Sequence, residues 1–371
     1  AKSYDEFDLL TFNKSEYLDA VKPQVKAENI SKILYPEDST PQGKALRLEQ
    51  QYFFVAASLH DAIRVFYPGQ SKPDLTTFPS KITFQLNDTH PVIGIPELMR
   101  ILIDEYGYDW DTAWSITTKT FNYTCHTLLP EALEVWPAKL ISELLPRHME
   151  IINEINEHFL AELKTKTRDK AKIERMRIVT DEENPKVRMA YLATAGGSHV
   201  NGVAELHSEL LKDVTLRDFS DLYGDKFTNV TNGVTPRRFV RMANPKLSEL
   251  INDAIGTGWV TDLERLKELE PYADDPDFRA QFRAAKAWNK VRLTSVLRAR
   301  DGIDLPDGHL VDVMVKRLHE YKRQSLKLLH IVSLYEQVLS GKIAASDLTP
   351  RTVVFGSKAA PGYAMAKETI H

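Results

Sequence analysis

From Val313 to Arg323 the sequence reads Val-Met-Val-Lys-Arg-Leu-His-Glu-Tyr-Lys-Arg. The apolar residues 311–315 are typical of a β-strand, and they end at two cations, with two more cations close behind. Positive charge near the start of a helix opposes the helix macrodipole unless a phosphate or carboxylate lies among the cations. We therefore interpret this cluster as a phosphate site; the competing interpretation is a solvated basic surface that pairs with acidic neighbours.

The residues after the cluster predict a helix. Leu328, Val332, Tyr335 and Leu339 repeat at helical spacing, and Gly341 ends the pattern. The cations thus fall at the carboxyl end of a predicted strand, which is where open α/β sheets bind their ligands.

Two similar strand-turn-helix units precede this one. A strand over 81–86 leads into the polar turn 87–91, and a strand over 187–193 leads into the glycine turn 196–199; a helical pattern follows each turn. A last strand is predicted over 352–355. Because strands alternate with helices along the chain, we expect an α/β fold with parallel sheets.

The length of the chain suits two domains. It has 371 residues, of which 43% are hydrophobic and 27% charged, as in ordinary globular proteins. A turn-rich segment, 230–238, interrupts the helical and strand patterns, so we place a domain boundary there, with domains over 1–232 and 233–371. Long helices of the first domain are predicted over 44–66, 110–121 and 138–163.

The composition excludes several classes of protein. The net charge of −4 gives no overall positive field to attract nucleic acid. Cys125 is the only cysteine, which rules out an internal disulfide framework and a cysteine-built zinc site, and we predict no metal. No apolar run reaches the ~18 residues that span a bilayer, and the first residues are not a secretory signal. We expect a cytoplasmic protein that does not bind membranes.

Several polar residues outside the cation cluster are candidates for ligand binding, each with a plain structural alternative. Asp88 follows a strand and could instead form an Asx turn or cap a helix. His126 could be a hydrogen-bonded core residue, and Lys358 could simply be exposed. The glycine turn 196–199 lacks the spacing of a P-loop or of a dinucleotide-binding motif.

Five motifs are spread over nearly the whole chain. They read Gln-Leu-Asn-Asp-Thr-His from Gln85, Tyr-Thr-Cys-His-Thr-Leu-Leu-Pro-Glu-Ala-Leu-Glu from Tyr123, Thr-Asn-Gly-Val-Thr-Pro-Arg-Arg from Thr231, Val-Lys-Arg-Leu-His-Glu-Tyr-Lys-Arg-Gln from Val315 and Lys-Ala-Ala-Pro-Gly-Tyr from Lys358. In this order and spacing they resemble the glycogen (α-glucan) phosphorylase family. Residues 35–43 and the helix after them are similar to the active-site gate loop of that family.

The resemblance implies a fold and an activity. The fold is two Rossmann-like domains of the GT-B type, the second one incomplete in this chain. The activity is retaining transfer of glucose from the non-reducing end of an α-1,4-glucan to inorganic phosphate, which gives glucose 1-phosphate. Such enzymes use pyridoxal phosphate through its phosphate group, and the full-length enzyme is expected to be an allosteric homodimer. Its partners are glycogen, starch or maltodextrin and inorganic phosphate.

The resemblance also assigns roles to the residues of the cation cluster. Arg317 and Lys322 hold the substrate phosphate, and Lys316 holds the cofactor phosphate, with Lys322 also counted among the cofactor-binding residues. Tyr321 contacts the hydroxyl groups of the glucosyl unit. A cluster of this kind would offset the repulsion between two neighbouring phosphates.

The sugar pocket is assigned in the same way. His126, a catalytic candidate together with the three cations, binds glucose with Asn232. Asp88 and His90 support that pocket, and Asp38 lies on the gate loop.

The chain departs from the family pattern at several positions. Cys125 replaces a usual Asn beside His126, His199 lies one residue late in the glycine turn, Met314 replaces a Gln and Ser357 a Gly. No lysine of this chain matches the motif of the lysine that binds pyridoxal phosphate covalently, and the regulatory N-terminal region of the family also has no counterpart. We therefore expect a central fragment that alone neither retains the cofactor nor catalyses phosphorolysis.

Two other functions fit the same sequence. A nucleotide-sugar glycosyltransferase of the same architecture would use the cations to bind a diphosphate leaving group. A non-catalytic glucan-binding module would bind glycogen without phosphorolysis.

Overall fold

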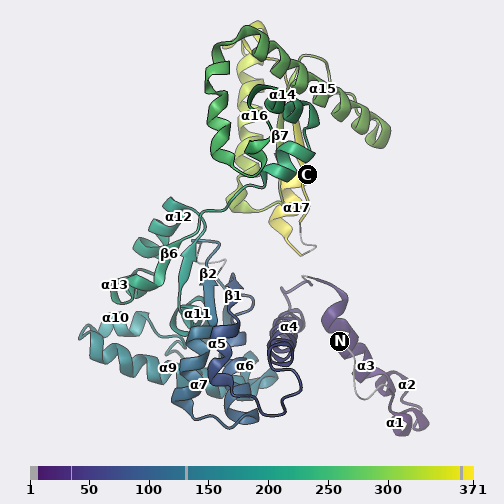
Figure 1. The fold of residues 1–371 in the computed structure, drawn as a ribbon. Helices are drawn as coiled ribbons and strands as arrows, with labels where there is room; N and C mark the ends of the chain where they lie inside the picture. The colour runs from purple at the N-terminus through teal and green to yellow at the C-terminus, as the bar shows by residue number, and fades with distance from the viewer. Residues whose placement is uncertain (1–6, 35, 130–132, 360–361) are drawn as a thin grey trace. The chain divides into compact units, whose positions relative to one another are not determined.

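The computed structural model describes residues 7–34, 36–129, 133–359 and 362–371. The chain divides into two compact units, Ala1–Asn232 and Gly233–His371 (Figure 1). Each unit is described by itself below.

The first unit is built on a parallel sheet whose strands follow the order β1-β2-β5-β6. The strands are β1 (Phe84–Asn87), β2 (Phe121–Thr124), β5 (Val200–Gly202) and β6 (Phe227–Asn229). The prediction of an α/β fold with parallel sheets is therefore confirmed. A separate antiparallel pair joins β3 (Val135–Pro137) to β4 (Lys186–Arg188).

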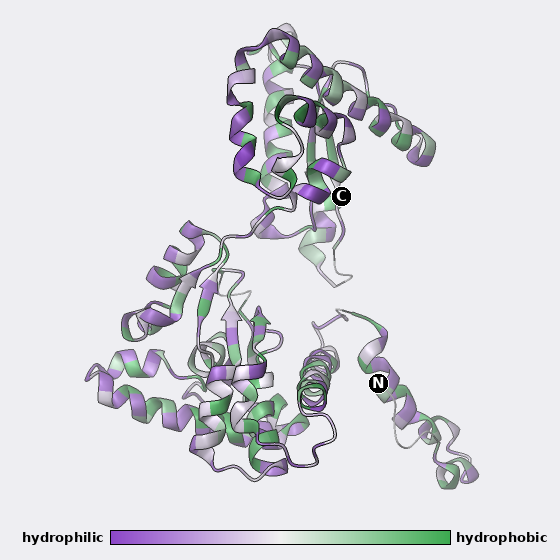
Figure 2. Ribbon diagram, in the orientation of Figure 1, coloured by the Kyte–Doolittle hydropathy of each residue, from purple (hydrophilic) through white to green (hydrophobic). Residues whose placement is uncertain are grey.

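Helices cover this sheet and supply its hydrophobic core. The main ones are α4 (Pro41–Phe66), α6 (Gly94–Arg100), α7 (Trp110–Thr120), α8 (Ala138–Leu144), α9 (Pro146–Lys166) and α11 (Met189–Gly196). Ile152, Ile155 and Phe159 of α9 are buried in the core. The single helix predicted over 138–163 is interrupted at Leu145, because Pro146 starts a new helix at a position that needs no backbone donor. In Figure 2 polar and apolar residues alternate around α4, as expected for a helix with one buried face.

The strand predicted over 187–193 is wrong. Strand β4 ends at Arg188, and Met189–Gly196 form helix α11, in which Met189, Leu192 and Ala193 are fully buried. A short, continuous apolar run is compatible with either a buried strand or a buried helix, so its pattern alone does not separate them. The glycine turn therefore follows a helix, and strand β5 begins after the turn.

Small helices flank these elements in the first unit. They are α1 (Leu9–Asn13), α2 (Tyr17–Ala20), α3 (Lys22–Lys32), α5 (Phe78–Lys81), α10 (Lys170–Arg175), α12 (Glu205–Leu210) and α13 (Arg217–Leu222). Lys81 thus ends a helix, and the predicted strand over 81–86 begins only at Phe84.

The second unit contains one parallel strand pair among its helices. Its elements are α14 (Pro245–Ile255), α15 (Pro276–Asp301), β7 (Leu310–Val315), α16 (Gln324–Leu339), β8 (Arg351–Gly356) and α17 (Ala364–Ile370). Both predicted strands and the helix after the cation cluster are confirmed, and Gly341 after α16 has the positive φ of +70° that ends many helices. No helix in the described ranges is long and apolar enough to cross a bilayer.

Candidate functional site

Polar side chains gather at the carboxyl edge of the four-stranded sheet in the first unit. Asp88 and His90 follow β1, His126 follows β2, and Asn232 follows β6. Because parallel strands end at the same edge of a sheet, these four predicted residues belong to one side of the unit.

Asp88 is held in a strained turn at the end of β1. Its φ of +64° lies in the left-handed region, which residues other than glycine rarely adopt. Its backbone N–H donates to the carbonyl of Thr124 at 3.0 Å, and its Oδ1 accepts from the Thr89 N–H at 2.7 Å. The Asp88 side chain thus stabilises its own turn, which ties the end of β1 to the end of β2.

His90 forms an ion pair with Glu134, a residue to which the sequence assigned no role beyond its place in a motif. The His90 Nδ1 lies 3.0 Å from Glu134 Oε1, while Gln51 and Thr89 donate to the same carboxylate at 2.8 and 3.0 Å. Burial acts to raise the pKa of Glu134, but these donors lower it overall. The bond to Glu134 raises the pKa of His90, although burial opposes it. The pair therefore favours the charged forms of both groups.

His126 and Cys125 point to opposite sides of the strand end. His126 is exposed, and its Nε2 lies 3.2 Å from Oδ1 of Asn87, the last residue of β1. Cys125 is buried, its Sγ donates to the Thr127 carbonyl at 3.0 Å, and burial raises the pKa of its thiol. The replacement at Cys125 therefore changes the core beneath His126 rather than the exposed surface.

Asn201 is a site-edge residue that the sequence did not reveal. Its Oδ1 accepts from Thr124 Oγ1 at 2.8 Å and lies 3.3 Å from Gln85 Nε2, so it links three strands at one level. Its position directly after a glycine turn and a valine was the available signal, but the strand had been predicted before that turn.

Asn232 is tied to this edge through its backbone. Its N–H donates to the Val203 carbonyl at 2.9 Å, and the Val230 N–H donates to the Gly202 carbonyl at 3.1 Å. The chain that leaves β6 thus lies beside the chain that leaves β5.

A cavity of about 550 Å³ adjoins the β1 end of this edge. It lies between α4 and β1, and most of its exposed wall is apolar; its polar lining residues are Arg47, Gln50, Gln51, Ser58, Gln85, Asn87 and His90. Its other lining residues include Leu34, Phe54, Val55, Leu59, Phe84, Leu86 and Phe121.

The cation cluster of the second unit occupies the loop between β7 and α16. Glu320–Lys322 form a short 3₁₀ turn, and Arg323, with φ of +64°, precedes the first residue of α16. Lys322 therefore lies before the helix, on a bent turn, as convergence with Arg317 would require. The Leu318 N–H donates to the Lys358 carbonyl at 3.0 Å, and the buried Gln324 Nε2 donates to the Arg317 carbonyl at 2.9 Å. These two bonds fix the loop from both sides.

The acidic residue within the cluster is directed to a tyrosine. The Tyr363 hydroxyl lies 3.0 Å from Glu320 Oε2, and the ring of His319 lies between Tyr321 and Tyr363. Among the described residues, Lys316, Lys322 and Arg323 form no ion pair with a carboxylate. This donor set suits an added anion such as a phosphate.

Asp38 lies on the exposed loop before α4. Thr40 caps that helix by accepting from the Gly43 N–H at 3.0 Å, and a Cβ at Gly43 would lie 2.0 Å from the Glu37 carbonyl oxygen, so only glycine fits there. Tyr35 of the proposed gate loop lies outside the described residues, as do 130–132 and 360–361 of two motifs.

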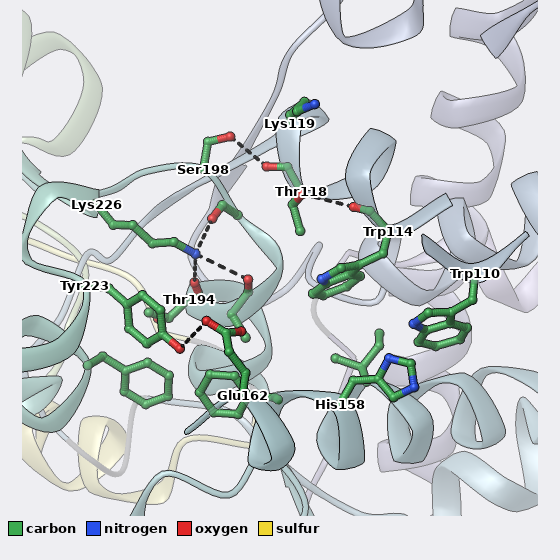
Figure 3. A pocket seen from close by; sticks show the side chains of 15 residues that line it. Trp110, Trp114, Thr118, Lys119, His158, Glu162, Thr194, Ser198, Tyr223 and Lys226 are labelled. Carbon is green, nitrogen blue, oxygen red and sulfur yellow. Dashed lines mark hydrogen bonds between the residues drawn. The ribbon is translucent and has the colours of Figure 1, made fainter. Parts of the chain in front are cut away.

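A second cavity, of about 470 Å³, lies at the opposite edge of the same sheet (Figure 3). Thr118 and Lys119 precede β2, and Gly197 and Ser198 precede β5, so the cavity belongs to the amino ends of these strands. None of the predicted site residues lines it. Lys226 extends into it from the left of the view and donates to three backbone carbonyls (Figure 3). Within the described ranges, no group of three or more His, Cys, Asp or Glu residues could hold a metal ion.

Comparisons with known proteins agree over the whole chain. A family model described as carbohydrate phosphorylase matches residues 1–371. A glycogen phosphorylase of Synechocystis is 47% identical over 368 residues, which are 99% of this chain and 43% of that relative. The corresponding protein of Pasteurella multocida is 44% identical over 99% of this chain and 44% of its own length. The muscle form of Bos taurus is 45% identical over 100% of this chain and 44% of its own length. The chain thus spans less than half the length of the curated relatives it matches.

Proposed function

The chain belongs to the carbohydrate phosphorylase family, and we propose that it is the part of a glycogen phosphorylase that binds the glucosyl unit and the substrate phosphate. The complete enzyme would transfer glucose from the non-reducing end of an α-1,4-glucan to inorganic phosphate with retention of configuration. The observation that carries the proposal is the 47% identity over 99% of the chain. The assembly of Asp88, His90, His126 and Asn232 at one sheet edge supports it.

We assign the two units to the two domains of the GT-B architecture. Residues 1–232 would belong to the N-terminal domain, which binds the sugar, and residues 233–371 would form the first part of the C-terminal domain, which binds phosphate. Both units carry their candidate residues at carboxyl ends of parallel strands, which is the position of ligands in folds of this class.

On the sugar side, the proposed ligands are His126 and Asn232. The Asn87 carboxamide orients the His126 ring, and the Val203 carbonyl orients the Asn232 backbone. The ion pair of His90 with Glu134 and the turn of Asp88 would hold this edge rigid. Prior orientation lowers the entropy lost when the sugar hydroxyl groups are bound.

On the phosphate side, the proposed ligands are Arg317 and Lys322, with Tyr321 near the sugar. In the reaction the bond between glucosyl C1 and the leaving O4 breaks, a bond between C1 and a phosphate oxygen forms, and the leaving oxygen takes a proton from the phosphate. Cations placed before the reaction stabilise the negative charge that must collect beside C1. The fixed loop after β7 keeps them in place without reorganisation.

Pyridoxal phosphate would supply a second phosphate group next to the substrate. Lys316 and Lys322 suit that group, because neither forms an ion pair with a carboxylate among the described residues. The covalent lysine of the family has no match in this sequence, so these residues would hold the phosphate of the cofactor and not its aldehyde. A cytoplasmic location, a homodimeric full-length enzyme and an α-1,4-glucan partner form part of the same proposal.

A chimera tests the proposal. This chain would replace the matching 368 residues of the Synechocystis relative, and formation of glucose 1-phosphate from glycogen and phosphate would be measured. We expect phosphorolysis by the chimera, a loss of at least about a thousandfold with Arg317→Ala, and none from the isolated chain supplied with pyridoxal phosphate. A folded chimera that binds maltoheptaose yet releases no glucose 1-phosphate would contradict the proposal.

A further inference from the structure

His207 lies on α12, the helix that follows β5 of the sheet whose carboxyl edge carries His126 and Asn232. Its Nδ1 accepts a hydrogen bond from the Val203 N–H at 3.2 Å. A neutral imidazole that accepts at Nδ1 carries its proton on Nε2, so this contact selects one tautomer of the ring. The bond spans the turn between β5 and α12.

The other ring nitrogen of His207 has no hydrogen-bond partner among the residues that the structure describes, although it is shielded from water. A buried donor without a partner is costly and is uncommon in folded proteins. The hydrogen bond that holds the ring is therefore the one accepted by Nδ1. Burial and the nearby His126 lower the pKa of His207, which favours the neutral ring.

Val203 connects His207 to the proposed sugar ligand. The same peptide segment that donates to His207 accepts, through the Val203 carbonyl, the N–H of Asn232 at 2.9 Å. The backbone at Gly202 packs closely against α12, because a Cβ at Gly202 would lie 2.8 Å from His207 Nδ1 and 2.3 Å from Ser208 Oγ. Ser208 in turn donates to Asn229 Oδ1 at 2.8 Å, at the end of β6.

We propose that His207 is a positioning residue that fixes the backbone of Asn232 through Val203 and so sets the affinity of the sheet edge for glucose. The sugar part of this inference rests on the proposed function. The structural part, in which the His207 imidazole fixes Val203 and Val203 fixes Asn232, is independent of the proposed function.

Two variants distinguish the effect of the hydrogen-bond acceptor of His207 from the effect of the size of its side chain. In His207→Asn the amide oxygen can take the place of Nδ1, whereas His207→Phe keeps a ring of similar size without an acceptor. His158→Phe serves as the control, because His158 is an exposed residue of α9 in the same unit. Deuterium exchange of the peptides that contain Val203 and Asn232 would be measured by mass spectrometry, and glucose affinity would be measured by titration of the same chains.

For His207→Phe we expect about tenfold faster exchange at Val203 and Asn232, and about tenfold weaker glucose binding, the upper end of what one hydrogen bond is worth. In His207→Asn and in the control, the exchange rates and the glucose affinity should both stay within about twofold of those of the unaltered chain. Unchanged exchange at both peptides in His207→Phe would overturn the inference. If the unaltered chain binds no glucose, the proposed function of this unit fails, and the exchange data still decide the role of His207.

Discussion

Asp88 and Arg323 share an unusual backbone conformation, each in a loop that follows a parallel strand. Each is a non-glycine residue with φ of +64°; Asp88 directly follows β1, whereas Arg323 lies eight residues after the end of β7 and directly precedes α16. Such conformations cost roughly 1 kcal/mol and persist where the surrounding structure imposes them, often at ligand sites. Asp88 belongs to the residues that we propose for the sugar pocket, and Arg323 to the cation cluster that we propose for phosphate.

The strain at Arg323 can be separated from its charge. Arg323→Asn keeps a residue that tolerates the left-handed region, and Arg323→Gly removes the strain. We expect the free energy of unfolding of both variants to lie within about 0.5 kcal/mol of that of the unaltered chain, because the relief of strain offsets the lost contacts. Phosphate affinity, measured by titration, should fall about tenfold in both. Undiminished phosphate binding in both variants would remove Arg323 from the site.

The ion pair of His90 and Glu134 predicts a pH dependence of stability. The raised pKa of His90 stabilises the fold below its ordinary value of 6.5 and this contribution is lost as pH rises; the lowered pKa of Glu134 stabilises above 4.5 and is lost as pH falls. Both contributions are present between these values. Glu134→Gln should therefore cost about 1–2 kcal/mol near pH 5.5, a figure reduced because His90 is partly exposed, and less at pH 8.

Urea unfolding of the unaltered chain and of Glu134→Gln, each at pH 5.5 and pH 8, measures how the cost of the substitution depends on pH. Glu150→Gln, at an exposed position of α9, is the control and should show no such dependence on pH. An equal cost of Glu134→Gln at the two pH values would contradict the assigned ion pair.

At the scale of elements, the Lys226 side chain caps the carboxyl end of helix α11. Its Nζ donates to the carbonyls of Thr194 at 3.2 Å, Ala195 at 3.4 Å and Gly197 at 3.0 Å, at the carboxyl end of α11 (Figure 3). These carbonyls have no partner within the helix, and a cation at this end also favours the helix dipole. Lys226 thereby fixes the turn that leads into β5.

Lys226→Met should destabilise the chain by about 2 kcal/mol, because the carbonyls lose their donor while the apolar stem is kept. Lys166→Met is the matched control, since Lys166, like Lys226, lies over the Tyr223 ring but pairs with Glu162 at the surface. The midpoints of urea unfolding measure both. If the two variants lost equal stability, the bonds to α11 would not be what Lys226 contributes.

Some of the helices and strands could be predicted from the sequence pattern, and others could not. The strand before the cations and the helix after them were predictable, because a β-type run, a basic turn and a 3.6-residue repeat follow each other within thirty residues. Helix α11 and strand β5 were not, since most of Met189–Ala193 is buried, with only Tyr191 partly exposed, and β5 is only three residues long. Glu134 and Asn201 were missed as site residues because their partners, His90 and Gln85, lie far away in the sequence.

At the scale of the molecule, the two units differ in how much core they have. The first has a continuous core that runs from Leu48 to Phe219, whereas the second has a small cluster around Trp259. On α16, moreover, Tyr335 and Leu339 are 61% and 63% exposed, so this helix buries little apolar surface in the described residues. Since apolar burial is the main source of folding free energy, the units should differ in stability.

We therefore expect the second unit to open first, by local unfolding that leaves the first unit intact. In native-state hydrogen exchange, β7 and α16 should exchange at least about tenfold faster than β2 and α9, which corresponds to roughly 1.4 kcal/mol or more. Tryptophan fluorescence offers an independent probe, because Trp259 reports on the second unit. The second unit holds two tryptophans, Trp259 and Trp288, so replacing both by Phe should remove the early fluorescence change in urea unfolding, whereas Trp114→Phe should leave that change in place. A single transition that is the same for all regions would contradict this expectation and would show that the two units unfold together.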